Sequence, residues 1–120
     1  MVLVIGKISV PTPGTPIQVT AQAVWGEALA EVGFSTQFLT VQAILFQAWK
    51  ANTGQVYLGK IGMNKGTGAK VMSVLVTPTT AGIPSVGASN HLSLAGIDVS
   101  AFYLDADVAT DGVLVSALVS

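Results

Sequence analysis

Short apolar runs alternate with turn-forming residues along most of the chain. Runs of Val, Ile, Leu, Phe and Thr are broken by Gly, Pro, Asn or Asp about every eight to twelve residues, a spacing typical of antiparallel β proteins. The pattern predicts an all-β fold, an antiparallel β-sandwich of about eight strands with at most one short helix. The expected strands cover residues 2–10, 15–23, 36–49, 54–60, 70–77, 91–96, 98–105 and 112–119.

The strands differ in how many of their faces are apolar. In TPIQVTAQA, Ile17, Val19 and Ala21 alternate with polar residues, which predicts one buried face and one exposed face. The runs at 36–49 and 112–119 carry apolar residues on both parities. We therefore expect each of these two strands to lie centrally in a sheet or to pack its second face on a partner.

One segment has helical spacing. In WGEALAEVG, residues 25–33, Glu27 and Glu31 are four residues apart, and Gly33 is placed to end the helix. The two glutamates are expected to form a solvated face. No composition shift, low-complexity tract or solenoid repeat interrupts the 120 residues, so a single domain spanning 1–120 is the simplest organisation.

The composition is unusual for a protein without a membrane span. Only 9% of residues are charged and 51% are hydrophobic, against about 25% charged in typical domains. The longest uncharged stretch, 71–97, contains Pro78, Pro84 and several glycines, which excludes a spanning helix. A net charge of −1 and the absence of arginine argue against nucleic acid as a partner. Low charge favours association, so we expect the chain to work as an assembly.

Two glycine-containing segments come close to nucleotide-binding motifs. GQVYLGKI, residues 54–61, matches the phosphate loop except that Ile61 replaces the hydroxyl residue that binds magnesium. The residues between its glycines favour an extended chain, so we predict a strand entered through a turn at 52–54. KGTGAKV, residues 65–71, begins a dinucleotide fingerprint that Val71 fails to complete, and we interpret it as a loop.

The residues that usually carry catalysis are sparse. There are no cysteines, and His91 is the single histidine, which we interpret as a polar residue at the start of a strand. The segment 105–112 contains three aspartates near Asp98, so calcium binding is one hypothesis. A turn at Asp111 that opens the last strand is the simpler alternative. We predict no catalytic residues, no cofactor and no metal. The aspartates concerned are Asp98, Asp105, Asp107 and Asp111.

Charge placement suggests where partners would contact the chain. Four of the five lysines fall within 21 residues, and the four aspartates cluster near the end of the sequence. The two clusters could meet between neighbouring subunits, where they would fix the register of the contact. Scattered solvated lysines are the alternative. The lysines of the cluster are Lys50, Lys60, Lys65 and Lys70.

Two motifs resemble those of small virion proteins of tailed bacteriophages. NTGQVYLGK, residues 52–60, precedes DVSAFYLDADVATDGV, residues 98–113, in the order and spacing seen in those proteins, and the resemblance covers residues 36–119. It implies a compact, jelly-roll-like β-sandwich of the capsid decoration or cement type. Such a protein binds the capsid exterior, bridges major capsid subunits and is commonly a homotrimer, with a homodimer as the alternative. The stretch 62–70 departs from the pattern as an insertion.

A tail or fibre module that binds a host glycan or receptor is the alternative function, because such modules use the same sandwiches. Exposed aromatic residues would favour it, and Trp25 and Trp49 are the candidates, although tryptophans are more often core or interface anchors. The candidate partner contacts are Trp25, Trp49, Lys50, Lys60, Lys65 and Lys70.

Overall fold

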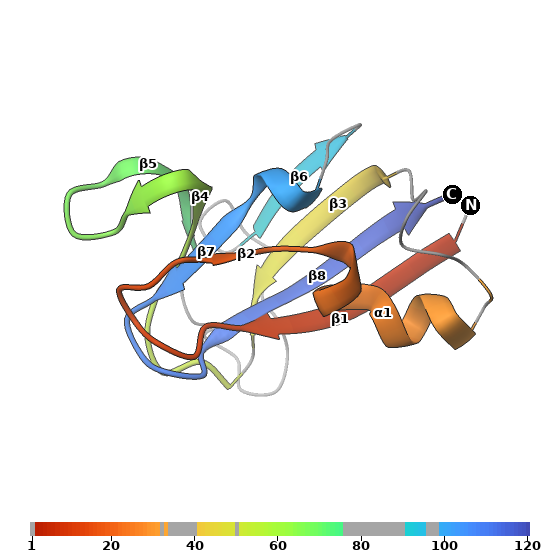
Figure 1. Ribbon diagram of the computed structural model, residues 1–120, viewed down its shortest axis with the longest axis horizontal. Helices are drawn as coiled ribbons and strands as arrows, with labels where there is room; N and C mark the ends of the chain where they lie inside the picture. Colours follow the sequence, from red (N-terminus) through yellow and green to blue (C-terminus); the bar gives the residue numbers. More distant parts are fainter. Residues whose placement is uncertain (1, 32, 34–40, 50, 76–90, 96–98) are drawn as a thin grey trace.

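In the part of the chain that the structure describes, the strands form two antiparallel sheets accompanied by one α-helix, which places the chain in the all-β class (Figure 1). The computed structural model describes residues 2–31, 33, 41–49, 51–75, 91–95 and 99–120. The first sheet has the order β1-β8-β3-β6 and the second the order β2-β7-β4-β5. The strands are β1 (Val2–Ser9), β2 (Ile17–Gln18), β3 (Val41–Ala48), β4 (Val56–Asn64), β5 (Ala69–Leu75), β6 (His91–Ala95), β7 (Tyr103–Ala106) and β8 (Gly112–Val119).

The two strands predicted to have two apolar faces occupy the middle of the first sheet. β8 pairs with β1 on one side and with β3 on the other, and β3 pairs in turn with β6. The central position predicted for both runs is therefore confirmed. For the run 36–49, this concerns β3 alone, because residues 36–40 lie outside the described part of the chain.

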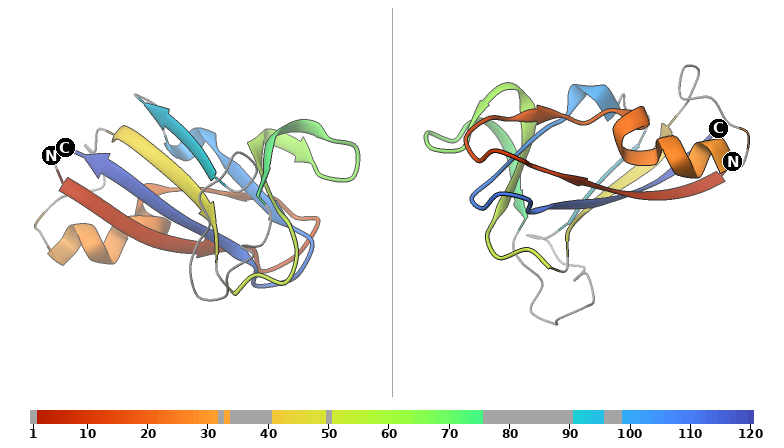
Figure 2. Two further views of the ribbon diagram at one scale, coloured as in Figure 1. Left: turned by 180° about the vertical axis from the view of Figure 1, so that it is seen from behind. Right: turned by 60° about the horizontal axis from the view of Figure 1, so that its bottom comes forward.

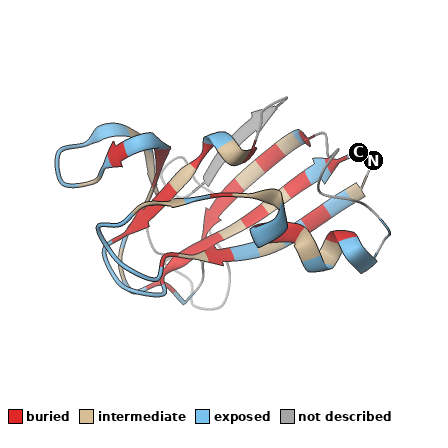
Figure 3. Cartoon of the chain, viewed as in Figure 1, coloured by how far each residue is buried: buried red, intermediate tan, exposed pale blue. Residues whose placement is uncertain are grey.

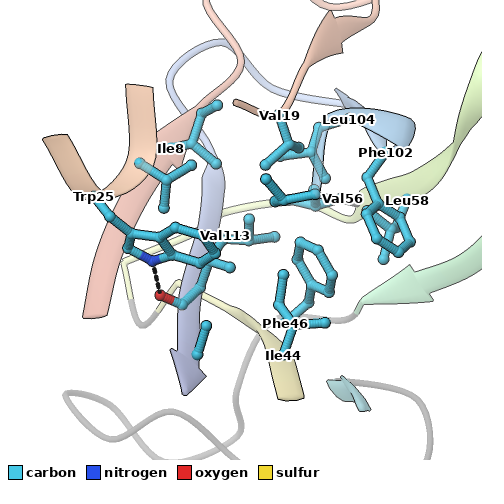
Figure 4. Packing of buried hydrophobic residues seen from close by; sticks show 14 of the residues in the cluster. Ile8, Val19, Trp25, Ile44, Phe46, Val56, Leu58, Phe102, Leu104 and Val113 are labelled. Atoms are coloured by element: carbon cyan, nitrogen blue, oxygen red, sulfur yellow. Dashed lines mark hydrogen bonds between the residues drawn. The ribbon is translucent and has the colours of Figure 1, made fainter. Parts of the chain in front are cut away.

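The core takes side chains from both sheets. On β8, the residues of one parity are buried, and on the second sheet Val56, Leu58 and Leu104 are fully buried (Figure 3). Phe46 of β3 and Phe102, just before β7, meet with ring centroids 5.0 Å apart (Figure 4). Aromatic side chains thus join the two sheets at the centre of the core.

The helix α1 (Ala21–Glu31) covers the part of the first sheet that lies next to β1. The indole N–H of Trp25 donates a hydrogen bond to the carbonyl oxygen of Val115, 3.0 Å away, and the side chain is fully buried (Figure 4). Gly6 of β1 allows this close packing, because a Cβ atom there would collide with the carbonyl oxygen of Val24. A glycine in the middle of a strand therefore positions the helix.

The strand predicted at 15–23 is largely wrong. Only Ile17–Gln18 pairs with β7, and α1 begins at Ala21, four residues before the predicted helix start. The hydroxyl oxygen of Thr20 accepts a hydrogen bond from the backbone N–H of Ala23, 3.2 Å away, and so caps the helix. The end is as predicted, since Gly33 has a φ of 77° and donates to the carbonyl of Ala30.

Two further boundaries differ from the prediction. In place of a continuous strand at 98–105, a short 3-10 helix at Val99–Ala101 precedes β7, which begins at Tyr103. The stretch 62–70, predicted as an insertion, is part of a β-hairpin, because β4 continues to Asn64 and β5 begins at Ala69. The loop predicted at 65–71 is confirmed only for residues 65–68, which form the turn of this hairpin. The extended strand predicted in place of a phosphate loop is confirmed, since β4 pairs with β5 and β7.

Candidate partner interfaces

The outer face of the first sheet carries an exposed apolar surface. The strand register aligns its side chains in rows across β1, β8 and β3: Leu3, Leu118 and Ala43 form one row, and Ile5, Ser116 and Leu45 the next. Leu114 stands at the centre of a third row. We call this surface the apolar face, made of Leu3, Ile5, Ala43, Leu45, Leu114 and Leu118.

The apolar face is open to solvent in the chain as it stands. Leu3 is 61% exposed, Ile5 52% and Leu118 38%. A shallow hollow of about 180 Å³ lies among Leu3, Leu45 and Leu118. Contiguous exposed apolar area of this kind usually marks a site of association. The apolar face is therefore the surface of the described chain that is best suited to burial against a partner.

One lysine borders the apolar face without entering it. Lys7 lies in the third row beside Leu114, and its ammonium group sits 4.6 Å from the centroid of the Trp49 ring. A cation over an indole face is held by electrostatic attraction. This contact keeps the charge of Lys7 at the border of the face and engages Trp49 within the chain.

A second exposed element is the outer half of the β4–β5 hairpin. We call residues 60–72 the arm; it projects from one end of the molecule, and α1 lies at the other end (Figures 1 and 2). Ile61 is 67% exposed and Met72 51%. Lys60 and Lys70 are also exposed. The arm thus presents apolar and basic side chains together.

The arm is fixed to the second sheet through its turn. The Lys65 ammonium donates to the carbonyl oxygen of Ala106 at 2.7 Å and forms an ion pair with Asp107 at 3.1 Å. The Tyr57 hydroxyl donates to the same carboxylate at 3.1 Å. Desolvation raises the pKa of Tyr57 above 10.0, and the hydrogen bond to Asp107 raises it further. The Tyr57 hydroxyl therefore remains a donor at neutral pH.

The other two described aspartates of the terminal cluster are buried, and their carboxylates accept hydrogen bonds from the backbone. Asp105 accepts hydrogen bonds from the backbone N–H groups of Gly14 and Ala106. Asp111 accepts from those of Thr53 and Gly54, the latter at 2.8 Å. Carboxylates that accept backbone N–H groups in this way are structural.

Two of the aspartates are buried and Asp107 pairs with Lys65, so these three carboxylates do not form an open acidic patch in the described part of the chain. Among the described residues, no group of three acidic or histidine side chains could hold a metal ion, which leaves the calcium hypothesis without geometric support there. Asp98 lies outside the described residues. The turn predicted at Asp111 is confirmed, since β8 begins at Gly112.

Asn52 forms a buried, reciprocal pair with Gly112. Its side-chain amide donates to the Gly112 carbonyl at 2.8 Å, and its side-chain oxygen accepts the Gly112 N–H at 2.9 Å. Asn52→Asp would replace the donor by an acceptor facing the carbonyl oxygen, close to the Asp111 carboxylate. We expect the free energy of unfolding to fall by about 2–4 kcal/mol.

The measurement is urea unfolding at neutral pH, with Asn52→Ala as the matched control. The alanine variant removes both hydrogen bonds without adding a charge, so we expect it to lose less stability than the aspartate variant. An aspartate variant as stable as the natural sequence would show that this pair is unimportant.

The predicted partner contacts are not all available to a partner. Trp25 is a core residue, so its assignment as a partner contact was wrong. Trp49 is half-buried, with the Lys7 ammonium over its ring. Lys65 forms an ion pair with Asp107 of the same chain. Lys60 and Lys70 are exposed on the arm, as a partner contact requires. Lys50 lies outside the described residues.

Two further predictions from the sequence are confirmed. Glu27 and Glu31 form the exposed helix face that was predicted, and His91 begins β6.

The surface residues that the sequence reasoning missed are apolar. Leu3 and Ile5 of β1 and Ile61 and Met72 of the arm were not singled out as contacts. Leu118 lies in the run 112–119, whose second face was expected to lie centrally in a sheet or to pack on a partner. The available signal was the unbroken run VLVI at 2–5, in which both parities are apolar.

Comparisons of the chain with protein families, with curated proteins and with solved structures find no match. Within the described part of the chain, no helix combines the length and apolar character needed to cross a membrane.

Proposed function

We propose that this chain is a structural virion protein that binds the outside of a bacteriophage capsid and stabilises it by bridging neighbouring major capsid subunits. The proposal includes a jelly-roll-like β-sandwich, a location on the capsid exterior, and self-association, with a homotrimer favoured over a homodimer. It assigns no catalytic activity, no cofactor, and neither nucleic acid nor membrane as a partner. The resemblance of 52–60 and 98–113 to decoration proteins supports it.

The observation that carries the proposal is the apolar face. A shell-bridging protein is held on the shell by non-covalent contacts, and the burial of apolar surface is the main favourable contribution to such contacts. Each 100 Å² of apolar surface removed from water contributes roughly 2.5 kcal/mol before the costs of association. With 9% charged residues, the chain has few groups to oppose such burial.

The alternative, a tail or fibre module that binds a glycan, has less support. Glycan sites rely on exposed aromatic rings, but Trp25 is buried in the core and Trp49 is half-buried with Lys7 over its ring. Neither tryptophan therefore offers the open ring face on which a sugar would stack. We keep the shell-binding function as the proposal.

A map of the particle that carries this protein tests the proposal directly. We expect density of the size of this chain on the outside of the shell, at junctions between capsid subunits, with the apolar face directed toward the shell. Density confined to the tail or its fibres would instead support the alternative function.

A further inference from the structure

Most charged side chains in the described part of the chain have a partner within it. Lys65 pairs with Asp107, Asp105 and Asp111 accept backbone hydrogen bonds, and Lys7 lies over Trp49. Among the described residues, two acidic and two basic side chains remain that have neither an ion pair nor one of these other contacts. These are Glu27, Glu31, Lys60 and Lys70.

The unpaired charges are separated by sign to opposite ends of the molecule. Lys60 and Lys70 lie on the arm, whereas Glu27 and Glu31 lie on α1 at the other end (Figure 1). The two glutamates line a groove of about 520 Å³ between α1 and β1. The exposed lysine pair of one copy is therefore complementary in charge to the exposed glutamate pair of a second copy.

The groove also meets an edge of β1 that no other described strand pairs with. The groove is lined by three consecutive residues of β1, Ile5 to Lys7. Because successive residues of a strand point to opposite faces of the sheet, this lining places the groove along the edge of β1. The opposite edge of β1 is paired with β8, and β1 stands at the end of the order of described strands in its sheet. An edge of this length that carries one charged residue is prone to pair with other chains.

We propose that the arm of one copy docks in the groove of a second copy, with Lys60 and Lys70 facing Glu27 and Glu31. The two lysines of the arm are opposite in charge to the two glutamates of the groove, where the third charged residue, Lys7, has its ammonium group over the Trp49 ring. The exposed apolar residues of the arm would be covered by α1 and the edge of β1. This inference rests on the self-association included in the proposed function and names the two surfaces that produce it. The contact adjoins the apolar face at Ile5, which also lines the groove, and leaves Leu3 and Leu118 of that face open to the shell.

The geometry makes this contact heterologous, because the arm and the groove are different surfaces. A heterologous contact between identical copies forms a ring when the rotation between copies closes and a filament when it does not. We expect a closed ring, with three copies for the favoured trimer. In such a ring every arm and every groove is occupied.

Charge reversal at the two ends tests the contact on the isolated chain by sedimentation. Lys60→Glu with Lys70→Glu and, separately, Glu27→Lys with Glu31→Lys should each weaken self-association at least about tenfold at low salt, because every junction then joins like charges. The variant that carries all four changes should recover association, since the signs are again opposite. Its net charge equals that of the natural sequence, so net charge cannot explain the recovery.

A matched control separates the arm from a general effect of charge. Lys60→Gln with Lys70→Gln and Thr12→Glu with Thr15→Glu change the net charge equally, but Thr12 and Thr15 lie in the exposed 11–16 loop. We expect the first pair to weaken association and the second to leave it unchanged. Circular dichroism confirms that every variant is folded.

Several results would overturn the proposal. These are a monomer of 12.2 kDa at all concentrations, reversal at either end that leaves association unchanged, or a folded four-fold variant that stays dissociated. Because these measurements use no particles, their failure is distinct from a failure of shell binding. Raising salt from about 0.05 to about 1 M should weaken this contact, since the Debye length falls below the range of surface pairs.

Discussion

Replacing Trp25 by alanine should lower the free energy of unfolding by about 3–5 kcal/mol. The side chain is fully buried and fills the space between α1 and the first sheet. Its removal leaves a cavity and deprives the Val115 carbonyl of its indole donor. The loss is measured by denaturant unfolding at several protein concentrations, so that any contribution from association is recognised.

Trp25→Phe is the control for this prediction. It keeps most of the apolar volume and removes the hydrogen bond, so we expect a smaller loss than with alanine. If alanine at position 25 changed the unfolding free energy by less than about 1 kcal/mol, Trp25 would not be the residue that holds α1 on the sheet.

Placing a charge on the apolar face should prevent attachment to the capsid. Leu118 lies in the first row of that face, between Leu3 and Ala43. Leu118→Asp would bury an unpaired carboxylate in the proposed contact, at a cost of several kcal/mol. Every 1.4 kcal/mol is a factor of about ten, so binding to stripped particles should weaken at least about a hundredfold.

Val108→Asp is the matched control. Val108 is 40% exposed and Leu118 38%, but Val108 lies in the loop before β8 and away from the apolar face. The same new charge at that position should leave attachment close to that of the natural sequence. Equal binding by the two folded variants would mean that the apolar face does not contact the shell.

The sequence alone predicted the β class and the central strands because alternation and turns are local signals. It could not place the helix start, since Ile17 and Val19 suit a strand as well as the approach to a helix. That choice depends on Thr20 as a cap and on Gly6, a distant residue that lets α1 approach β1. Neither effect is visible in the period of the apolar residues.

The candidate contacts were predicted less well for a related reason. Counting lysines along the chain cannot show that Lys65 reaches Asp107, 42 residues away, whereas Lys60 and Lys70 have no such partner among the described residues. Lys70 also has a φ of 56°, which is uncommon for a residue other than glycine and follows from the irregular pairing of the arm. Only the three-dimensional structure shows which charged side chains have no contact within the chain and are available to a partner.

Attachment of the protein to intact particles at rising salt tests the central claim, that apolar burial holds it on the shell. Particles are incubated from about 0.05 to about 1 M sodium chloride, which shortens the Debye length from above 10 Å to about 3 Å, and the pelleted fraction of this protein is measured. Contact through the apolar face predicts that the protein stays with the particles, because salt does not screen apolar burial. Complete release at the highest salt, with the shell intact, would contradict the account and assign the contact to charge.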